Sequence, residues 1–366
     1  MNTTLVRRVV LPGVAALALA SLVACGDNNG SPSSKQSSGN SGSSLSGTIS
    51  AGGSSAQGVA QTQWIRDFQS AHSGVTVTYN PVGSGSGVTS FTSGAYPFAG
   101  SDAFLSSDQY GPAKQHCGAD PIEVPDYIDP VAVAFNLPGI SKLNMSGKVI
   151  AEIFNGTITK WNDPAIAHLN PGVKLPSTTI QPVHRSDDSG TTDNFTDYLS
   201  QASDGAWKSP ASETWPTTKG LNGDGTSGVV TAAKGATGSI AYIDASQAGG
   251  FGIVSVQVGS KFVAPDAAKA ANDLAASKLD PTAKPDQMIY DINRTTTDPS
   301  MYPILLTSYL VACQHYGNAN TAALVKSYLS YIVSPAGQQS GSQASGAAPL
   351  TPALSQKATA ILSKIS

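Results

Sequence analysis

Charged side chains are scarce in this sequence. Only 12% of the residues are Asp, Glu, Lys or Arg, about half the usual share, and 21 basic residues stand against 24 acidic ones. This composition excludes a basic nucleic-acid-binding protein and a charge-rich helical rod. Removing residues 1–24, which hold Arg7, Arg8 and no acid, changes the formal net charge from −3 to −5. Such a surface does not attract anions over long distances, so any anion site must depend on local groups.

The chain has one long uncharged apolar run, and it is short for a membrane helix. Residues 9–24 are dominated by Val, Leu and Ala, whereas a membrane span needs about 20 apolar residues. A basic start, an apolar middle and a small-residue end predict a secretory signal peptide over residues 1–24. Leu22-Val23-Ala24-Cys25 resembles a bacterial lipobox. This predicts cleavage before Cys25 and a diacylglycerol on its sulfur; an ordinary signal peptide with an incidental cysteine is the alternative.

The segment after Cys25 predicts a tether. Residues 26–47 are almost wholly Ser, Gly, Asn and other polar types, which cannot bury enough apolar surface to fold. We therefore predict a lipidated cysteine and flexible linker over residues 25–46. The globular part would then be anchored to the cell membrane on its extracytoplasmic face.

Cysteine is also rare, with three in the chain. If Cys25 is acylated, Cys117 and Cys313 remain as an even pair in an oxidising compartment, which favours a disulfide over two buried thiols. That bond would close a loop of about 200 residues and stabilise the fold by roughly 4–5 kcal/mol, less any strain.

From Thr48 onward the pattern predicts an α/β fold in which three junctions share one layout. Each junction is a strand, a turn of small residues and a helix; the turns are Gly52–Ser55, Gly83–Gly87 and Ser186–Thr192. Strands are predicted at residues 48–51, 75–79, 131–135, 180–185 and 253–258, the fourth of them broken by Pro182. Helices are predicted at residues 60–71, from 88, around 195–199, at 320–332 and from 353.

The three junctions point to an anion. A helix N-terminus presents unpaired N–H groups and a partial positive charge, glycine lets the backbone approach a ligand, and Ser and Thr add hydroxyl donors. The alternative at any one junction is simple N-capping. Three such junctions in one chain, one of them preceded by Arg185, favour a shared anion.

Enzyme signatures are missing. No nucleophile elbow, phosphate-binding P-loop or H-E-x-x-H motif occurs. Gly223–Gly228 fits G-x-G-x-x-G, but residues 217–222 before it do not read as a strand, so no dinucleotide site is predicted there. The five histidines lack metal-ligand spacing. We predict neither a metal nor a cofactor.

Several segments resemble the substrate-binding protein of the Pst-type phosphate ABC transporter, and the resemblance runs from Thr48 to the C-terminus. The segments that carry it are Gly52–Ser55, Val82–Ser84, Phe98–Ala103, Ile153–Gly156, Trp161–Ile166, Arg185–Thr191 and Gly235–Tyr242. The Arg-x-Asp-x-Ser-Gly-Thr segment and the Ser-Asp pair ending at Asp102 are the most specific.

The resemblance implies a set of phosphate contacts. Carried over position by position, they are Ser55, Ala56, Ser84, Asp102, Arg185, Ser189, Gly190 and Thr191, with Asp187 holding the arginine fork in place. Ala56 stands where relatives often have an aromatic residue, but the contact there is a backbone N–H. The Asp102 carboxylate would accept a hydrogen bond from the proton that phosphate keeps and sulfate lacks, unless it only caps a turn.

The resemblance also implies the architecture and the partners. It predicts the type II periplasmic-binding-protein fold, with domain I at residues 47–126 and 297–366, domain II at 127–296, and a ligand cleft and hinge between them. Cys117 and Cys313 would then join the two segments of domain I. The monomeric protein would bind phosphate and deliver it to permease subunits driven by a cytoplasmic ATPase, without catalysis. The alternatives are a binding protein for sulfate or molybdate and, less favoured, a secreted phosphatase.

Overall fold

The computed structural model describes residues 45–366, which are organised around one 11-stranded mixed sheet. The strands are β1 (Gly47–Gly53), β2 (Val75–Asn80), β3 (Phe98–Ser101), β4 (Ile122–Phe135), β5 (Lys142–Met145), β6 (Gln181–Arg185), β7 (Leu221–Gly223), β8 (Ser239–Asp244), β9 (Gly252–Val258), β10 (Lys261–Val263) and β13 (Leu305–Ala312); β11 (Lys278–Leu279) and β12 (Tyr290–Asp291) form a separate ribbon.

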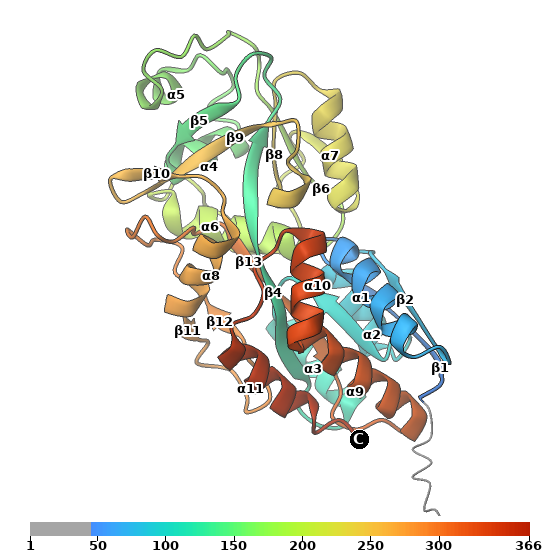
Figure 1. Cartoon of the computed structure of the whole chain (residues 1–366). Coiled ribbons are helices and arrows are strands. Elements are labelled where there is room, and N and C mark those ends of the chain that lie inside the picture. The colour runs from blue at the N-terminus through green and yellow to red at the C-terminus, as the bar shows by residue number, and fades with distance from the viewer. Residues whose placement is uncertain (1–44) are drawn as a thin grey trace, which may run out of the picture. The chain divides into compact units, whose positions relative to one another are not determined.

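Eleven α-helices connect and cover these strands (Figure 1). They are α1 (Gly58–Ala71), α2 (Ser84–Thr92), α3 (Ser107–Cys117), α4 (Gly147–Phe154), α5 (Pro164–Leu169), α6 (Gly190–Ala202), α7 (Gly225–Gly235), α8 (Ala267–Ala276), α9 (Ala319–Val333), α10 (Pro335–Ser345) and α11 (Pro352–Leu362). No helix in this described range is long and apolar enough to cross a membrane. Cys25, the predicted lipidation site, lies outside the described residues.

β4 is the strand that connects the two parts of the sheet. All 14 of its residues are buried, including Glu123, Asp126 and Asp129. Its first part pairs antiparallel with β13, and its second part pairs antiparallel with β8 and β9. Figure 1 shows β4 running from the group that contains α1, α2 and α9 to the group that contains α4 and α7. Because neither face of β4 is exposed to solvent, β4 can pack within both groups along its length.

The strand order in the first group is β2-β1-β3-β13-β4. β1 pairs parallel with β2 and β3, so the carboxyl ends of β1 and β3 lie at one edge. β13 lies antiparallel between β3 and β4 although it begins 170 residues after the end of β4. In the second group the order continues β4-β8-β6-β7.

Most predicted elements are confirmed, and three details of the prediction are wrong. Pro182 does not break its strand, because β6 continues through it and pairs with Ile240. The helix predicted from residue 88 begins at Ser84, so the Ser-Gly turn forms its first turn. Residues 221–223 are a strand, β7, which pairs parallel with β6 and leads directly into α7.

The predicted disulfide is present. Cys117, at the end of α3, is bonded to Cys313, just after β13, with their Cα atoms 5.1 Å apart. The bond lies in an apolar cluster with Val88, Phe91 and Val311. It therefore joins an early and a late segment of the chain in the same packed region.

Candidate functional site

The turns before α1, α2 and α6 meet at one place, as the sequence predicts. The N–H of Gly83 donates to the carbonyl of Gly53 at 2.9 Å, linking the turns before α1 and α2. The N–H of Gly85 donates to the carbonyl of Asp188 at 3.2 Å, linking α2 to the turn before α6. The N-termini of α1, α2 and α6 therefore lie close together, and each helix N-terminus carries a partial positive charge.

For the description of the site we define two walls by sequence. The first wall comprises residues 54–57, 83–85 and 102; the second wall comprises residues 185–191 and 225–226. Glycine permits their close approach. A Cβ atom on Gly190 would lie 2.7 Å from the carbonyl carbon of Asp102, and one on Gly83, whose φ is +93°, would lie 2.5 Å from the Asp187 carboxylate. Both distances are too short for a side chain, so these positions require glycine.

Asp102 is the central acid of the first wall. It follows β3 and is only 2% exposed. The hydroxyl of Ser54 donates to one carboxylate oxygen at 2.6 Å, and that of Ser308 donates to the other at 2.8 Å. Burial raises the pKa of Asp102, while the two hydroxyls and the charge of Arg185 oppose the rise. A carboxylate has about four acceptor positions, so two donors leave it able to accept from a ligand.

Ser84 lies beside Asp102 in the first wall. Its hydroxyl accepts a hydrogen bond from the Asp102 N–H at 3.1 Å, and the side chain is 1% exposed. Ser55 and Ala56 lie at the start of α1 and line a neighbouring cavity of about 310 Å³. The Ser55 hydroxyl accepts from the Thr226 N–H at 3.1 Å. Ser55 therefore joins the first wall to the N-terminus of α7.

Arg185 and Asp187 form a fork in the second wall. Arg185 Nε donates to Asp187 Oδ1 at 2.7 Å, and Arg185 Nη2 donates to Oδ2. The N–H of Gly225 donates to the same Asp187 Oδ1 at 3.0 Å. Burial acts to raise the pKa of Asp187, but Arg185 and Gly225 outweigh it and hold that pKa below its ordinary value. Asp187 thus stays ionised and fixes the plane of a guanidinium that is 4% exposed.

The N-terminus of α6 completes the second wall. Ser189 is its N-cap, with Oγ accepting from the Thr192 N–H at 3.3 Å. Gly190 packs directly on Asp102, as described above. The Thr191 hydroxyl is buried, and its proximity to Asp102 opposes the rise in the pKa of that carboxyl, but it makes no hydrogen bond of good geometry within residues 45–366. A buried hydroxyl without a partner is costly, and a bound anion could satisfy it.

The sequence prediction missed several residues at these walls. Ser54 and Ser308 hold Asp102, Asn194 donates to the Asp102 carbonyl at 2.6 Å, and Thr226 contacts Ser55. Ser54 belongs to the Gly-Gly-Ser-Ser turn, so its place beside the other turn residues is the signal that could have found it. The sequence predicts no dinucleotide site at Gly223–Gly228, because residues 217–222 do not read as a strand. β7 does precede it, and the N-terminus of α7 is a fourth helix end at the site.

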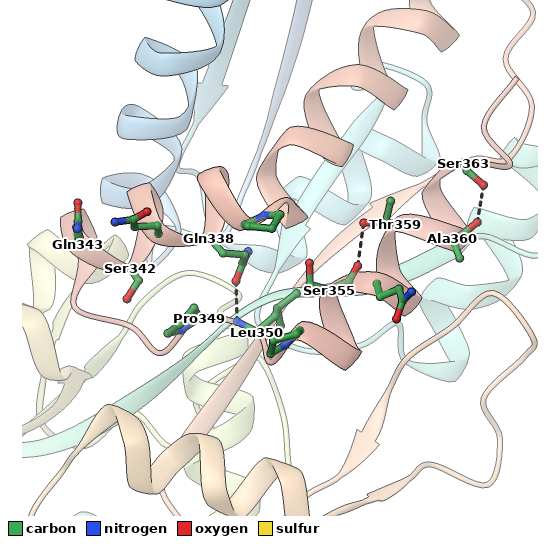
Figure 2. A pocket seen from close by; sticks show the side chains of 13 residues that line it. Gln338, Ser342, Gln343, Pro349, Leu350, Ser355, Thr359, Ala360 and Ser363 are labelled. Carbon is green, nitrogen blue, oxygen red and sulfur yellow. Dashed lines mark hydrogen bonds between the residues drawn. The ribbon is translucent and has the colours of Figure 1, made fainter.

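A larger cavity lies elsewhere, between α10 and α11. Figure 2 shows this groove, which has a volume of about 790 Å³ and is lined by residues such as Pro335, Leu350 and Thr359. None of its lining side chains is charged, so it offers an anion no counter-charge. Within residues 45–366, no group of three or more His, Cys, Asp and Glu side chains is arranged to hold a metal ion.

Comparisons with known proteins identify the family of this chain. The profile of the PBP superfamily domain matches residues 38–336. The chain is 36% identical to phosphate-binding protein PstS2 of Mycobacterium bovis, over 94% of this chain and 95% of the relative. It is 34% identical to phosphate-binding protein PstS 3 of Mycobacterium leprae, over 90% and 91% of the two chains.

Solved structures show the same fold. A high-affinity periplasmic phosphate-binding protein, solved with bound phosphate, superposes with a TM-score of 0.70 at 22% identity, covering 86% of this chain and 93% of its own. A phosphate-binding protein from Stenotrophomonas maltophilia superposes with a TM-score of 0.63 at 19% identity, covering 86% and 94%. The type II periplasmic-binding-protein architecture predicted from the sequence is thereby confirmed in its fold class. This chain belongs to the PstS family of phosphate-binding proteins, within the PBP superfamily.

Proposed function

We propose that this protein binds inorganic phosphate outside the cytoplasm and delivers it to the permease of an ABC transporter for import. The observation that carries the proposal is the opposed pair of Asp102 and the Arg185–Asp187 fork, held at the meeting point of helix N-termini. Such a site offers a proton acceptor and a planar cation to the same small ligand. Phosphate near neutral pH carries both negative charge and a proton, so it uses both groups.

Each predicted contact has a role in this proposal. Arg185 donates its remaining N–H groups to phosphate oxygens, and Asp187 keeps the guanidinium in position. Ser55, Ser84, Ser189 and Thr191 donate from hydroxyls, while Ala56 and Gly190 donate from the backbone. Asp102 accepts from the phosphate O–H. Support comes from the burial of Ser84, Asp102, Arg185, Ser189 and Thr191, each no more than 4% exposed, because buried donors and charges act strongly on a ligand.

We infer that the two walls belong to two domains that close around the ligand. Domain I would comprise residues 47–126 and 297–366, and domain II residues 127–296. The pairing of β4 with β13 on one side and with β8 on the other supports a hinge in that strand. The contacts of Gly85 with Asp188 and of Ser55 with Thr226 correspond to the closed arrangement of such a hinge.

The remaining parts of the proposal concern location and partners. A lipid on Cys25 would hold a monomer at the outer face of the membrane, where the permease recognises the closed form. No bond of phosphate is broken in this cycle, so the protein acts as a carrier and no cofactor takes part.

A titration with three oxyanions tests the proposal. Phosphate-free protein is titrated with phosphate, sulfate and molybdate by calorimetry, with tryptophan fluorescence as a second signal. Trp215 is a suitable reporter because it stacks on His184, next to Arg185, with ring centroids 5.2 Å apart. We expect phosphate to bind far more tightly than the other two. Tighter binding of sulfate or molybdate would overturn the choice of ligand.

An assay for hydrolysis of a phosphate ester tests whether the protein lacks catalytic activity. A chromogenic phosphate ester is incubated with the protein, and we expect no hydrolysis above that of buffer. Hydrolysis that disappears when Ser189 or Asp102 is changed would contradict the carrier function and favour a phosphatase.

A further inference from the structure

Asn194 joins the two walls through their backbone. It lies one turn into α6 and is 5% exposed. Its amide nitrogen donates to the carbonyl of Asp102 at 2.6 Å and to the carbonyl of Gly190 at 2.9 Å. One side-chain amide therefore connects the backbone of the first wall to the helix N-terminus of the second.

Arg294 fixes the orientation of that amide. Arg294 Nη2 donates to Asn194 Oδ1 at 2.6 Å, and the guanidinium is almost wholly buried. A guanidinium can only donate, so the amide oxygen must face Arg294 and the amide nitrogen must face Asp102. The hydrogen bond from a cation also polarises the amide and strengthens its N–H donors.

Arg294 is itself anchored on both sides. Its Nη1 donates to the carbonyls of Pro303 at 3.0 Å and Leu305 at 2.7 Å, and its Nε donates to Asp197 at 2.8 Å. Leu305 begins β13 and pairs with Pro130 of β4, whereas Asp197 lies on α6. The guanidinium thus connects the start of β13 to the helix that carries Asn194.

We infer that Asn194 is a latch residue that holds the two walls together after the ligand has entered, and that Arg294 positions it. This inference rests on the proposed phosphate binding. Asn194 donates to the backbone carbonyl of Asp102, so it acts through the position of the Asp102 loop. The bond to the Asp102 carbonyl forms only when the walls are in contact. Its loss should therefore speed release of phosphate and leave the initial encounter unchanged.

Stopped-flow kinetics with inorganic phosphate test the latch. Asn194→Ala removes the amide without adding charge, and we expect the dissociation rate constant to rise at least tenfold while the association rate constant changes less than threefold. Asn194→Asp is the second variant, because it preserves the shape and the acceptor for Arg294. It should also raise the dissociation rate, and any effect of its extra charge on approach appears in the association rate.

Asn136→Ala is the matched control. The Asn136 amide also donates to backbone carbonyls, those of Ala233, Lys234 and Ala236, but all of them lie at the end of α7, away from the walls. We expect this control to leave both rate constants unchanged. Thermal unfolding of each phosphate-free variant verifies that it is folded.

The outcomes separate the two proposals. If the unaltered protein binds phosphate and both Asn194 variants release it within twofold of the normal rate, the latch is wrong and the proposed function stands. The latch is also wrong if association slows by the same factor as dissociation accelerates, because that pattern indicates a distorted site. If the unaltered protein does not bind phosphate, the proposed function fails and the latch fails with it.

Discussion

The two walls of the site carry opposite chemistry. The first wall presents a carboxylate, Asp102, which two hydroxyl groups hold in place. The second wall presents a guanidinium, Arg185, which another carboxylate holds in place. In the proposed site the acid of the first wall, Asp102, contacts the ligand itself, whereas the acid of the second wall, Asp187, only holds the guanidinium in place.

This difference explains how a protein with a net charge of −3 can hold an anion. Burial raises the pKa of Asp102, while the pKa of Asp187 is held below its ordinary value. The two acids thus have separate tasks, set by their surroundings. A ligand that satisfies both walls must carry negative charge toward Arg185 and a proton toward Asp102.

Removing the cation of the second wall should have the largest effect. Arg185→Ala deletes the counter-charge and leaves Asp187 buried without its partner, so we expect phosphate affinity to fall roughly a thousandfold, about 4 kcal/mol. Calorimetry measures the loss. Arg66→Ala is the control, because that side chain is 73% exposed on α1 and should not matter. A loss below tenfold for Arg185→Ala would remove Arg185 from the site.

Glu123 is a buried carboxylate in the same sheet, outside the two walls. Changing it should therefore alter the stability of the protein and leave its phosphate affinity unaltered. Glu123 is 1% exposed, and burial raises its pKa to about 7, although the Leu105 N–H and the Gln287 amide oppose the rise. The unfolded chain releases this proton near its ordinary pKa, so stability falls as pH rises from about 4.5 through 7, by on the order of 3 kcal/mol.

Glu123→Gln should flatten that pH dependence. Denaturant unfolding at pH 5 and pH 7.5 measures the free energy of unfolding, and the difference between the two pH values should shrink by on the order of 3 kcal/mol in the variant. Parallel pH profiles for the two proteins would show that Glu123 does not retain its proton. Phosphate affinity should be unchanged.

Preventing contact between the walls should have the next largest effect. Gly190→Ala places a Cβ atom 2.7 Å from both the Asp102 carbonyl carbon and the Ala103 nitrogen. Overlap with backbone costs about 1–3 kcal/mol, so we expect roughly thirtyfold weaker phosphate binding by calorimetry. Gly235→Ala is the control, since its Cβ would meet no atom within 4 Å. Equal affinity of Gly190→Ala and the unaltered protein would mean that the walls need not touch.

Neutralising the first wall should change the choice of ligand more than the strength of binding. Asp102→Asn keeps the shape and removes the charge that repels fully deprotonated sulfate. We expect a smaller loss of phosphate affinity than for Arg185→Ala. The affinity for sulfate relative to phosphate should rise at least about tenfold, or ~1.4 kcal/mol. An unchanged phosphate-to-sulfate ratio would contradict the role of Asp102.

Ionic strength should have the smallest effect. Binding by short hydrogen bonds in a closed site is poorly screened, so phosphate affinity should fall less than roughly tenfold between low and high salt. Calorimetry at the two salt concentrations measures this. A fall of several hundredfold would mean that long-range attraction, not the walls, holds the anion.

The sequence was informative where function depends on local motifs. The turns before α1, α2 and α6 could be predicted because a ligand-binding helix end needs small residues and hydroxyls next to each other in the chain. The pairing of Cys117 with Cys313 followed from their number and the predicted compartment. The turns can be recognised from a few consecutive residues, and the disulfide from the number of cysteines.

Other features cannot be recognised from residues that are neighbours in the sequence. Ser308 lies 206 residues from the carboxylate it holds, inside a strand whose residues are all buried. β7 has only three residues, two of them exposed, so no alternation could indicate a strand. α2 begins at Ser84 although Gly and Ser are weak helix formers, and its packing against β1 and β3 decides the outcome. All three features depend on tertiary contacts, which no short stretch of sequence contains.

The position of β13 sets an order of events during synthesis. β13 lies between β3 and β4, yet its residues, 305–312, are made long after both of them. Until they arrive, the facing edges of β3 and β4 have no partner, and Cys117 has no Cys313 to join. The sheet of the first group therefore cannot be completed until residue 312 has been made. Residues 319–362, which form α9, α10 and α11, follow β13 and pack against this group, so its folding is completed only after they too have been made.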